Sequence, residues 1–217
     1  MFMVDLVSIG IGFVFGIVAS GISALVYEYG TRPLLQVLLD DSPRAQGQKQ
    51  GKAPHEFYHL KVRNVPPRWP LPGRKPAWAC KATNVVFDLN GKRVIPDPII
   101  ARWPSQPEPL LPAVNAGQVT NLLDPTRLVA AQSIDVHTHE DQQLNVAIKY
   151  EGSQDCHIFS NESYLYPMWQ NPAWRLGNGT YKLKITLYYE RGAREFDFNL
   201  LNTGSTRDDL SIELWQP

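Results

Sequence analysis

Hydrophobic residues follow two patterns along this chain, and the first of them fills the N-terminus. From Leu6 to Tyr27 no charged residue occurs. A helix of this length, at about 1.5 Å per residue, reaches roughly 33 Å and crosses a hydrocarbon layer of about 30 Å. The segment is apolar on every side, unlike a helix that packs on a domain through one stripe. It is also longer than the apolar part of a signal peptide and lacks a basic start. The sequence therefore predicts a retained transmembrane anchor over residues 1–30.

The second pattern has a period of two and follows a polar, Gly- and Pro-bearing stretch at 40–54, which we predict to be a flexible loop. Apolar and polar residues alternate, as in half-buried strands, in four segments: 56–64, 143–150, 180–189 and 194–201. In the second segment, Leu144, Val146, Ile148 and Tyr150 are expected to share one face of the strand.

Turn residues agree with a β domain. Asn90-Gly91 separates two apolar runs and is the strongest short hairpin signal, and residues 189–193 join the two most regular strands. Eighteen Pro and a charged content of 19% fit short strands joined by rigid turns. Residues 31–217 are therefore predicted to form one all-β domain, an antiparallel β-sandwich.

Two parts of the chain carry a family resemblance. Residues 177–201 resemble the last two strands of an immunoglobulin-like or fibronectin-like sandwich, with Tyr181 at the place of the corner tyrosine. Residues 57–64 and 77–87 resemble the second and third strands. The whole resembles uncharacterised prokaryotic single-pass membrane proteins with such a domain. Leu183 stands where antibody domains have their second cysteine, so the resemblance implies an immunoglobulin-like sandwich without the antibody disulfide, and it implies no catalytic residue.

Small residues recur every fourth position of the apolar segment and would form one ridge on a helix: Ser8, Gly12, Gly16, Ser20 and Ala24. Such a ridge allows close approach of a second copy or of another membrane helix. The alternative is that small residues are simply common in membrane helices.

Charge places the domain on one side of the membrane. No Lys or Arg precedes the apolar segment, whereas Arg32, Arg44 and Lys49 follow it, which predicts a cytoplasmic domain. Sequons at 161–163 and 178–180 would matter only for an outward-facing domain.

Cys80 and Cys156 are expected to be free buried thiols, or a single bridge in an oxidising compartment. The balance of 21 basic and 21 acidic residues makes nucleic acid a poor partner.

One constellation could bind a metal ion. Asp135, His137 and His139 lie two apart and would share one face of an extended strand. The alternative is an exposed polar strand end. The sequence contains no motif for nucleotide binding or covalent catalysis, so we expect no enzyme and no cofactor.

Two Pro- and aromatic-rich stretches, 65–78 and 163–174, are candidate contact surfaces. The expected interaction surface consists of Tyr164, Tyr166, Trp169 and Trp174. The expected membrane-proximal set, placed by strand direction, consists of Arg68, Trp69, Arg74, Lys75, Arg191 and Arg194. The alternative is that the aromatic side chains plug the open ends of the sandwich.

Taken together, the sequence predicts a membrane-anchored, non-enzymatic scaffold or protein-interaction subunit. Lipid would contact residues 6–27, and the partner protein is unknown. A second interpretation is an extracytoplasmic binding module on the cell surface, and a third is a metal-dependent enzyme built on His137 and His139.

Overall fold

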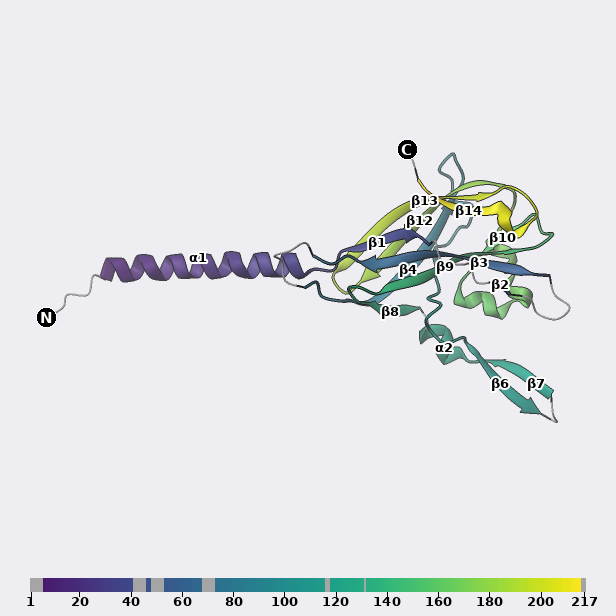
Figure 1. The fold of residues 1–217 in the computed structure, drawn as a ribbon, viewed down its shortest axis with the longest axis horizontal. Coiled ribbons are helices and arrows are strands. Elements are labelled where there is room, and N and C mark those ends of the chain that lie inside the picture. Colours follow the sequence, from purple (N-terminus) through teal and green to yellow (C-terminus); the bar gives the residue numbers. More distant parts are fainter. Residues whose placement is uncertain are drawn as a thin grey trace.

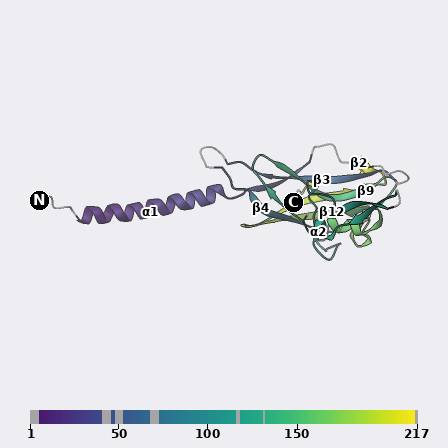
Figure 2. The same cartoon turned by 90° about the horizontal axis from the view of Figure 1, so that it is seen from below.

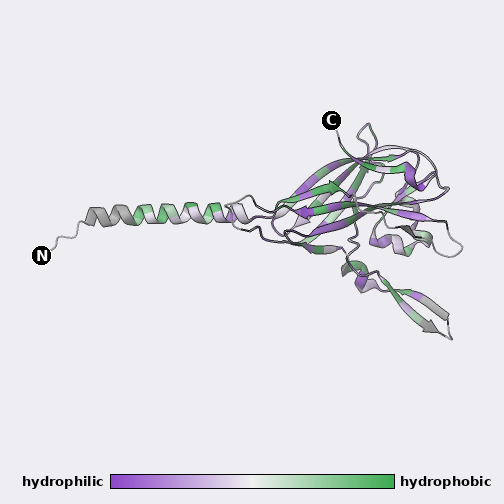
Figure 3. Ribbon diagram, in the orientation of Figure 1, coloured by the Kyte–Doolittle hydropathy of each residue, from purple (hydrophilic) through white to green (hydrophobic). Residues whose placement is uncertain are grey.

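A single helix leads into a β domain. The computed structural model describes residues 6–40, 46–47, 53–67, 73–115, 118–130 and 132–215. The helix α1, Leu6–Thr31, extends from one end of the domain along its long axis (Figures 1 and 2). Its side chains are described from Phe13 onward and remain exposed as far as Tyr27. Residues Phe13–Thr31 are long and apolar enough to cross a membrane, and Figure 3 shows their hydrophobic character. The predicted helix of membrane-span length is confirmed.

Two antiparallel sheets make up most of the domain. Sheet A contains, in order, β1 (Leu35–Leu39), β3 (His55–Asn64), β9 (Asp141–Tyr150), β10 (Cys156–Ile158) and β11 (Arg175–Leu176), with β2 (Gln46–Gly47) paired to β3. Sheet B contains β14 (Leu210–Leu214), β13 (Gly192–Asn202), β12 (Gly179–Tyr189), β4 (Ala77–Phe87) and β5 (Ile99–Ile100), with β8 (Ser133–Val136) paired to β4.

The remaining elements lie outside these two sheets. A hairpin of β6 (Leu110–Asn115) and β7 (Gln118–Leu123) projects beside α2 (Pro125–Ala130) in Figure 1. Four short 3₁₀ helices complete the description: η1 (Asn161–Leu165), η2 (Pro167–Trp169), η3 (Pro172–Trp174) and η4 (Arg207–Asp209).

The two sheets share one hydrophobic core. Leu60 and Leu144 from sheet A lie in the same fully buried cluster as Val86, Leu183 and Ile185 from sheet B. These residues occupy the apolar positions of alternating strands, and burying them between two sheets removes one face of each sheet from water. The prediction of an all-β antiparallel domain is confirmed, whereas the immunoglobulin-like assignment stays a prediction.

Both predicted hairpin turns are present. Gly91 has φ of 81°, and its N–H donates to the Asp88 carbonyl at 3.0 Å. Beyond this turn the Val94 N–H donates to the Val86 carbonyl at 2.9 Å. The second turn joins β12 to β13 through Glu190 and Arg191. A backbone position with a positive φ favours glycine, because glycine has no side chain to clash there. This explains why Asn90-Gly91 correctly predicts a turn.

The predicted face of β9 is wrong in its second half. His59 pairs with Asn145, but its neighbour Tyr58 pairs with Ala147, so β9 carries an extra residue between them. Such a bulge reverses which side chains point inward. Ile148 therefore lies in a separate cluster with Tyr150 and Phe159 instead of joining Leu144 in the main core.

Residues 99–103 connect the two sheets along one side. The Ala101 N–H donates to the Ala82 carbonyl of sheet B at 2.9 Å, and the Arg102 carbonyl accepts from the Asn145 N–H of sheet A at 2.9 Å. Trp103 is fully buried and fixes this crossing in the core. The segment therefore closes the sandwich beside β9 as far as residue 103.

Candidate functional site

The link between helix and domain is short and hydrogen-bonded. α1 ends at Thr31 and β1 begins at Leu35, so residues 32–34 connect them. The Thr31 carbonyl accepts from the Lys75 N–H at 2.8 Å, and the Arg32 carbonyl accepts from Arg74 Nη1 at 2.9 Å. After Pro33, the Leu34 carbonyl accepts from the Val65 N–H at 2.9 Å. Hydrogen bonds on both sides of Pro33 therefore leave this link little freedom to rotate.

The buried Asn64 side chain ties this link to the core. Its Oδ1 accepts from the Leu34 N–H at 3.0 Å, and its Nδ2 donates to the carbonyls of Lys75 at 2.9 Å and Val136 at 3.3 Å. Asn64 is fully buried, so each of these groups depends on the others for a partner. One amide thus joins the helix exit to the strands beside it.

Glu28 in the last turn of α1 lies among cations from three parts of the chain. Its carboxylate forms an ion pair with Arg191 of the β12–β13 hairpin. It lies 3.8 Å from Lys75 Nζ and 3.9 Å from Arg32 Nε. A cleft of about 40 Å³ beside these residues is lined by Trp78. Three cations therefore surround Glu28 at the end of the domain nearest α1, and Glu190 lines the same cleft. Glu28 was not among the residues selected from the sequence.

The expected membrane-proximal residues that the structure describes gather at this end. Arg74 and Lys75 bond to the helix exit, as described, and Arg194 Nη1 donates to the Leu35 carbonyl at 2.8 Å. Arg68 and Trp69 lie outside the described residues. Tyr27 and Tyr29 are 55% and 63% exposed, which suits the headgroup layer, where amphipathic rings are enriched.

The expected helix-packing ridge is open where it is described. Gly16 has space around it, because a Cβ built there would meet nothing within 4 Å. Ser20 and Ala24 are exposed on the same helix, and the Ser20 hydroxyl donates to the Ile17 carbonyl at 2.9 Å. Ser8 and Gly12 belong to α1, but their side chains lie outside the described part. Helix pairing through this ridge stays a prediction.

The expected aromatic interaction surface covers sheet A instead of facing solvent. The rings of Trp169 and Phe57 lie 5.5 Å apart, and those of Tyr164 and Phe159 lie 5.9 Å apart. The Tyr150 hydroxyl donates to the Met168 carbonyl. The segment thus buries the outer side of β9, which explains why the last seven residues of that strand are all buried.

Of the four selected aromatic residues, Tyr166 alone is exposed, at 37%. Trp174 packs against the main core, and Tyr164 and Trp169 pack in the smaller cluster. The expectation of one exposed surface is corrected, because the bulge in β9 turns apolar side chains outward and these rings cover them.

The expected metal ligands do not share a strand face. β8 ends at Val136, and His139 has φ of 73°, so the backbone leaves the extended conformation between them. Asp135 Oδ1 accepts from the Ala79 N–H at 2.8 Å, and the His137 ring lies 5.7 Å from the Trp78 ring. Within the described residues, no group of three His, Cys, Asp or Glu side chains is placed to hold a metal ion.

Cys80 and Cys156 are both free and buried, which confirms the expectation of free buried thiols instead of a bridge. Burial raises the pKa of Cys80 and of Cys156 to about 12, so neither thiol ionises near neutral pH.

The two sequons differ in exposure. Asn161 of the first sequon is buried, and its Oδ1 accepts from Arg102 Nη1 at 2.5 Å. Asn178 of the second sequon is exposed.

A buried ammonium group lies at the far end of the sandwich. Lys149 is fully buried, and its Nζ donates to Asn202 Oδ1 at 2.6 Å, to the Gly204 carbonyl at 2.7 Å and to the Gln154 carbonyl at 3.2 Å. Burial lowers the pKa of Lys149. Three acceptors satisfy the three hydrogens of the ammonium, which gives this lysine a structural role.

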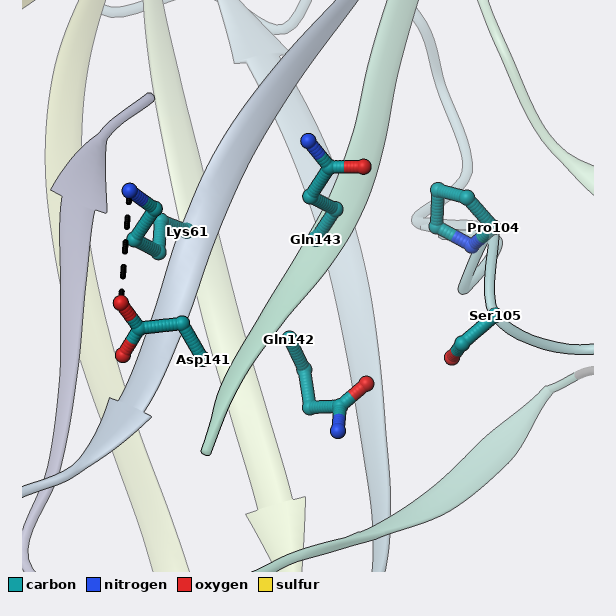
Figure 4. A pocket seen from close by; sticks show the side chains of 6 residues that line it. All are labelled: Lys61, Pro104, Ser105, Asp141, Gln142 and Gln143. Carbon is teal, nitrogen blue, oxygen red and sulfur yellow. Dashed lines mark ion pairs between the residues drawn. The ribbon is translucent and has the colours of Figure 1, made fainter. Parts of the chain in front are cut away.

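An open groove of about 510 Å³ lies beside the polar half of β9. Its lining residues are Lys61, Pro104, Ser105, Asp141, Gln142 and Gln143, drawn in Figure 4. This groove was not predicted from the sequence, because its two walls are far apart in the chain and meet only where residues 99–103 cross between the sheets. A proline that directly follows a buried tryptophan is the single local signal of that crossing.

The charges beside this groove are paired. Lys61 Nζ lies 3.5 Å from Asp40 Oδ1 and 4.0 Å from Asp141 Oδ2. Arg63 donates twice to Asp141, at 2.6 and 2.7 Å, and this bond lowers the pKa of the Asp141 carboxyl. Two cations and two acids therefore cancel, and the groove attracts no strongly charged ligand.

Comparisons with protein-family models, with curated proteins and with solved structures find no match to this chain.

Proposed function

We propose that this chain is a membrane-anchored, non-enzymatic subunit that presents its β-sandwich to another protein at the membrane surface. The observation that carries the proposal is the link of residues 32–34, with hydrogen bonds on both sides, between an exposed apolar helix and a packed domain. A domain held this way stays directly beside the bilayer. Confinement at the membrane raises the effective concentration of the domain for a partner in the same membrane.

The domain is proposed to face the cytoplasm. Arg32, Arg74 and Lys75 follow the apolar segment, and residues 1–5 contain no Lys or Arg. Arg74, Lys75 and Arg191 lie at the end from which α1 emerges, where anionic lipid would attract each cation by about 1 kcal/mol. Glu28 pairs with Lys75 and Arg191, which neutralises part of this charge and keeps these two cations oriented toward the helix.

The non-enzymatic part of the proposal is supported by the state of the reactive groups. The Cys80 and Cys156 thiols are buried with raised pKa values, and the Lys149 ammonium is fully bonded. A catalytic nucleophile needs an accessible, activated group. These three side chains lack that access.

Membrane fractionation of cells that express the full chain tests the proposal. The protein should remain in the membrane pellet after alkaline washing and should become extractable with mild detergent, whereas a chain that lacks residues 1–30 should be soluble. Protease added to intact cells should leave the domain uncut and should digest it after permeabilisation. Recovery of the full chain as a soluble protein contradicts the anchor, and digestion in intact cells contradicts the orientation.

A further inference from the structure

The edge of β9 that faces away from β3 is open over its first residues. β10 pairs with β9 only from Ala147 to Lys149. Nearer the start of β9, one isolated β-bridge among the described residues reaches this edge, between Arg102 and Asn145. No described strand pairs with this edge from Asp141 to Leu144. An unpaired strand edge presents main-chain donors and acceptors to whatever lies beside it.

The chain's own pairing segment stops abruptly. Residues 101 and 102 pair along this side, Trp103 is buried, and Pro104 follows. Proline has no N–H and turns the segment away, so Pro104 and Ser105 form the opposite wall of the groove instead of continuing the sheet. Figure 4 shows Gln142 and Gln143 on one side and Pro104 and Ser105 on the other.

The direction of the main-chain groups follows from the bridge. The Asn145 N–H points to this edge, because it donates to the Arg102 carbonyl at 2.9 Å. In a strand, alternate residues direct their N–H and C=O groups to the same edge. The main-chain groups of Gln143 and Asp141 therefore point into the groove, in line with the bond that Arg102 already makes.

We infer that an extended segment of a partner protein adds to sheet A as a strand in the groove between residues 141–143 and residues 104–105. This inference rests on the proposed function, since it supplies the contact with the partner. Strand addition uses main-chain bonds for affinity and alternate side chains for specificity. A three-residue strand spans about 10 Å, and the groove of about 510 Å³ lies within the usual range of binding sites.

The chemistry of the walls defines the segment. Lys61 and Asp141 are already paired, so the groove favours an uncharged stretch over an acidic or basic one. The amide of Gln142 and the hydroxyl of Ser105 favour polar side chains. Because the groove has a wall on each side, a free extended segment fits it, whereas the edge of a second folded sandwich does not.

A selection of short random peptides displayed on phage, carried out on the full chain in mild detergent, supplies the probe. The selected peptides are then measured against Gln143→Pro and Gln143→Ala. Both variants lose the bond from Gln143 Nε2 to Asp40, but only the proline removes the N–H that faces the groove. Binding should weaken about tenfold or more in Gln143→Pro and stay close to wild type in Gln143→Ala.

A second variant guards against misfolding of the proline variant. Ser105→Tyr fills the groove from the opposite wall without changing a residue of β9 and should weaken the same peptides, whereas Lys92→Tyr in an exposed turn should not. N-methylation of successive peptide amides should abolish binding at every second position, which is the signature of strand pairing.

Three results overturn the inference: failure to select any peptide, binding by Gln143→Pro and Ser105→Tyr as tight as by the wild type, or an N-methyl scan without a period of two. Self-association of the wild-type chain that disappears in Gln143→Pro would assign the groove to a second copy and overturn the assignment to another protein. Peptide binding is measured in detergent and anchoring in cell membranes, so failure of one is distinguishable from failure of the other.

Discussion

The two ends of the sandwich are each closed by a buried asparagine, but the two closures differ in charge. At the end nearest α1, Asn64 connects the neutral main-chain groups of Leu34, Lys75 and Val136. At the far end, Asn202 accepts from the Lys149 ammonium and donates to the carbonyls of Gln154, Leu176 and Gly177. Both amides are fully buried.

This difference indicates where the domain tolerates change. A buried charge is stable only while every partner is present, so the far end must keep its complete network. At the near end the charges of Glu28, Lys75 and Arg191 lie on the surface, where water replaces a lost partner. The near end can therefore tolerate a change in its surroundings, such as the lipid of the proposed membrane, whereas the far end sets the stability of the fold.

Loss of Asn202 should have the largest effect. Asn202→Ala removes one acceptor from the buried ammonium and the donor from three carbonyls, which should lower the free energy of unfolding by about 3 kcal/mol. Denaturant unfolding of the full chain in mild detergent, followed by tryptophan fluorescence, measures the change. The control Asn199→Ala, on the same strand, should change it by less than about 0.5 kcal/mol. Equal effects in the two variants would show that the network contributes nothing.

Loss of Asn64 should come second. Asn64→Ala leaves one N–H and two carbonyls without their partner but leaves no charge unpaired, so we expect a loss of about 2 kcal/mol in the same assay. The helix exit should also become accessible to protease between Thr31 and Leu35, which the Asn202 variant should not show. A larger loss than that of Asn202→Ala contradicts the comparison.

Acid should weaken the far end through His157. Burial lowers the pKa of His157, with a smaller contribution from Arg175 that is opposed by Asp155. The folded state therefore binds fewer protons than the unfolded state, and the free energy of unfolding should fall as the pH drops below about 6.5. His157→Gln should flatten this dependence. His59, whose pKa burial also lowers, should leave part of the slope in that variant. An unchanged slope in His157→Gln removes His157 from the explanation.

Loss of the Glu28 charge should have the smallest effect on stability. Glu28→Gln weakens surface ion pairs to Arg191 and Lys75 and should change the free energy of unfolding by less than about 1 kcal/mol. Glu190→Gln, in the same hairpin, is the matched control. Only the Glu28 variant should bind vesicles that contain anionic lipid more tightly, because it frees the cations that Glu28 neutralises. Indistinguishable vesicle binding by the two variants contradicts this role.

Local alternation was enough to predict most strands but not the faces of β9. In β12 the inward residues Leu183, Ile185 and Leu187 follow the period of two without interruption, and all three are fully buried. In β9 one extra residue reverses the alternation, and nothing in the local pattern distinguishes Leu144 from Ile148. A bulge depends on the partner strand, so a single strand's sequence does not reveal it.

The candidate sites also differ in whether the sequence of one segment was enough to predict them. The direction of consecutive strands was enough to expect Lys75 and Arg191 at one end of the domain, and the structure brings both to Glu28. The groove beside β9 depends on residues 99–103 crossing from one sheet to the other, which is a long-range event. The aromatic segment was misread because Trp and Tyr are suited to contacts with a partner and with the protein's own sheet alike.

The link of residues 32–34 limits how the domain finds other molecules. Three extended residues span at most about 10 Å, so the domain cannot sweep through a large volume as a domain on a long flexible tether does. With α1 in a bilayer, as proposed, the domain would meet molecules that diffuse in the same bilayer or pass close to its surface. The rate of meeting a partner would then be set by lateral diffusion in two dimensions, and lengthening the link with Gly and Ser would shift that rate toward capture from solution.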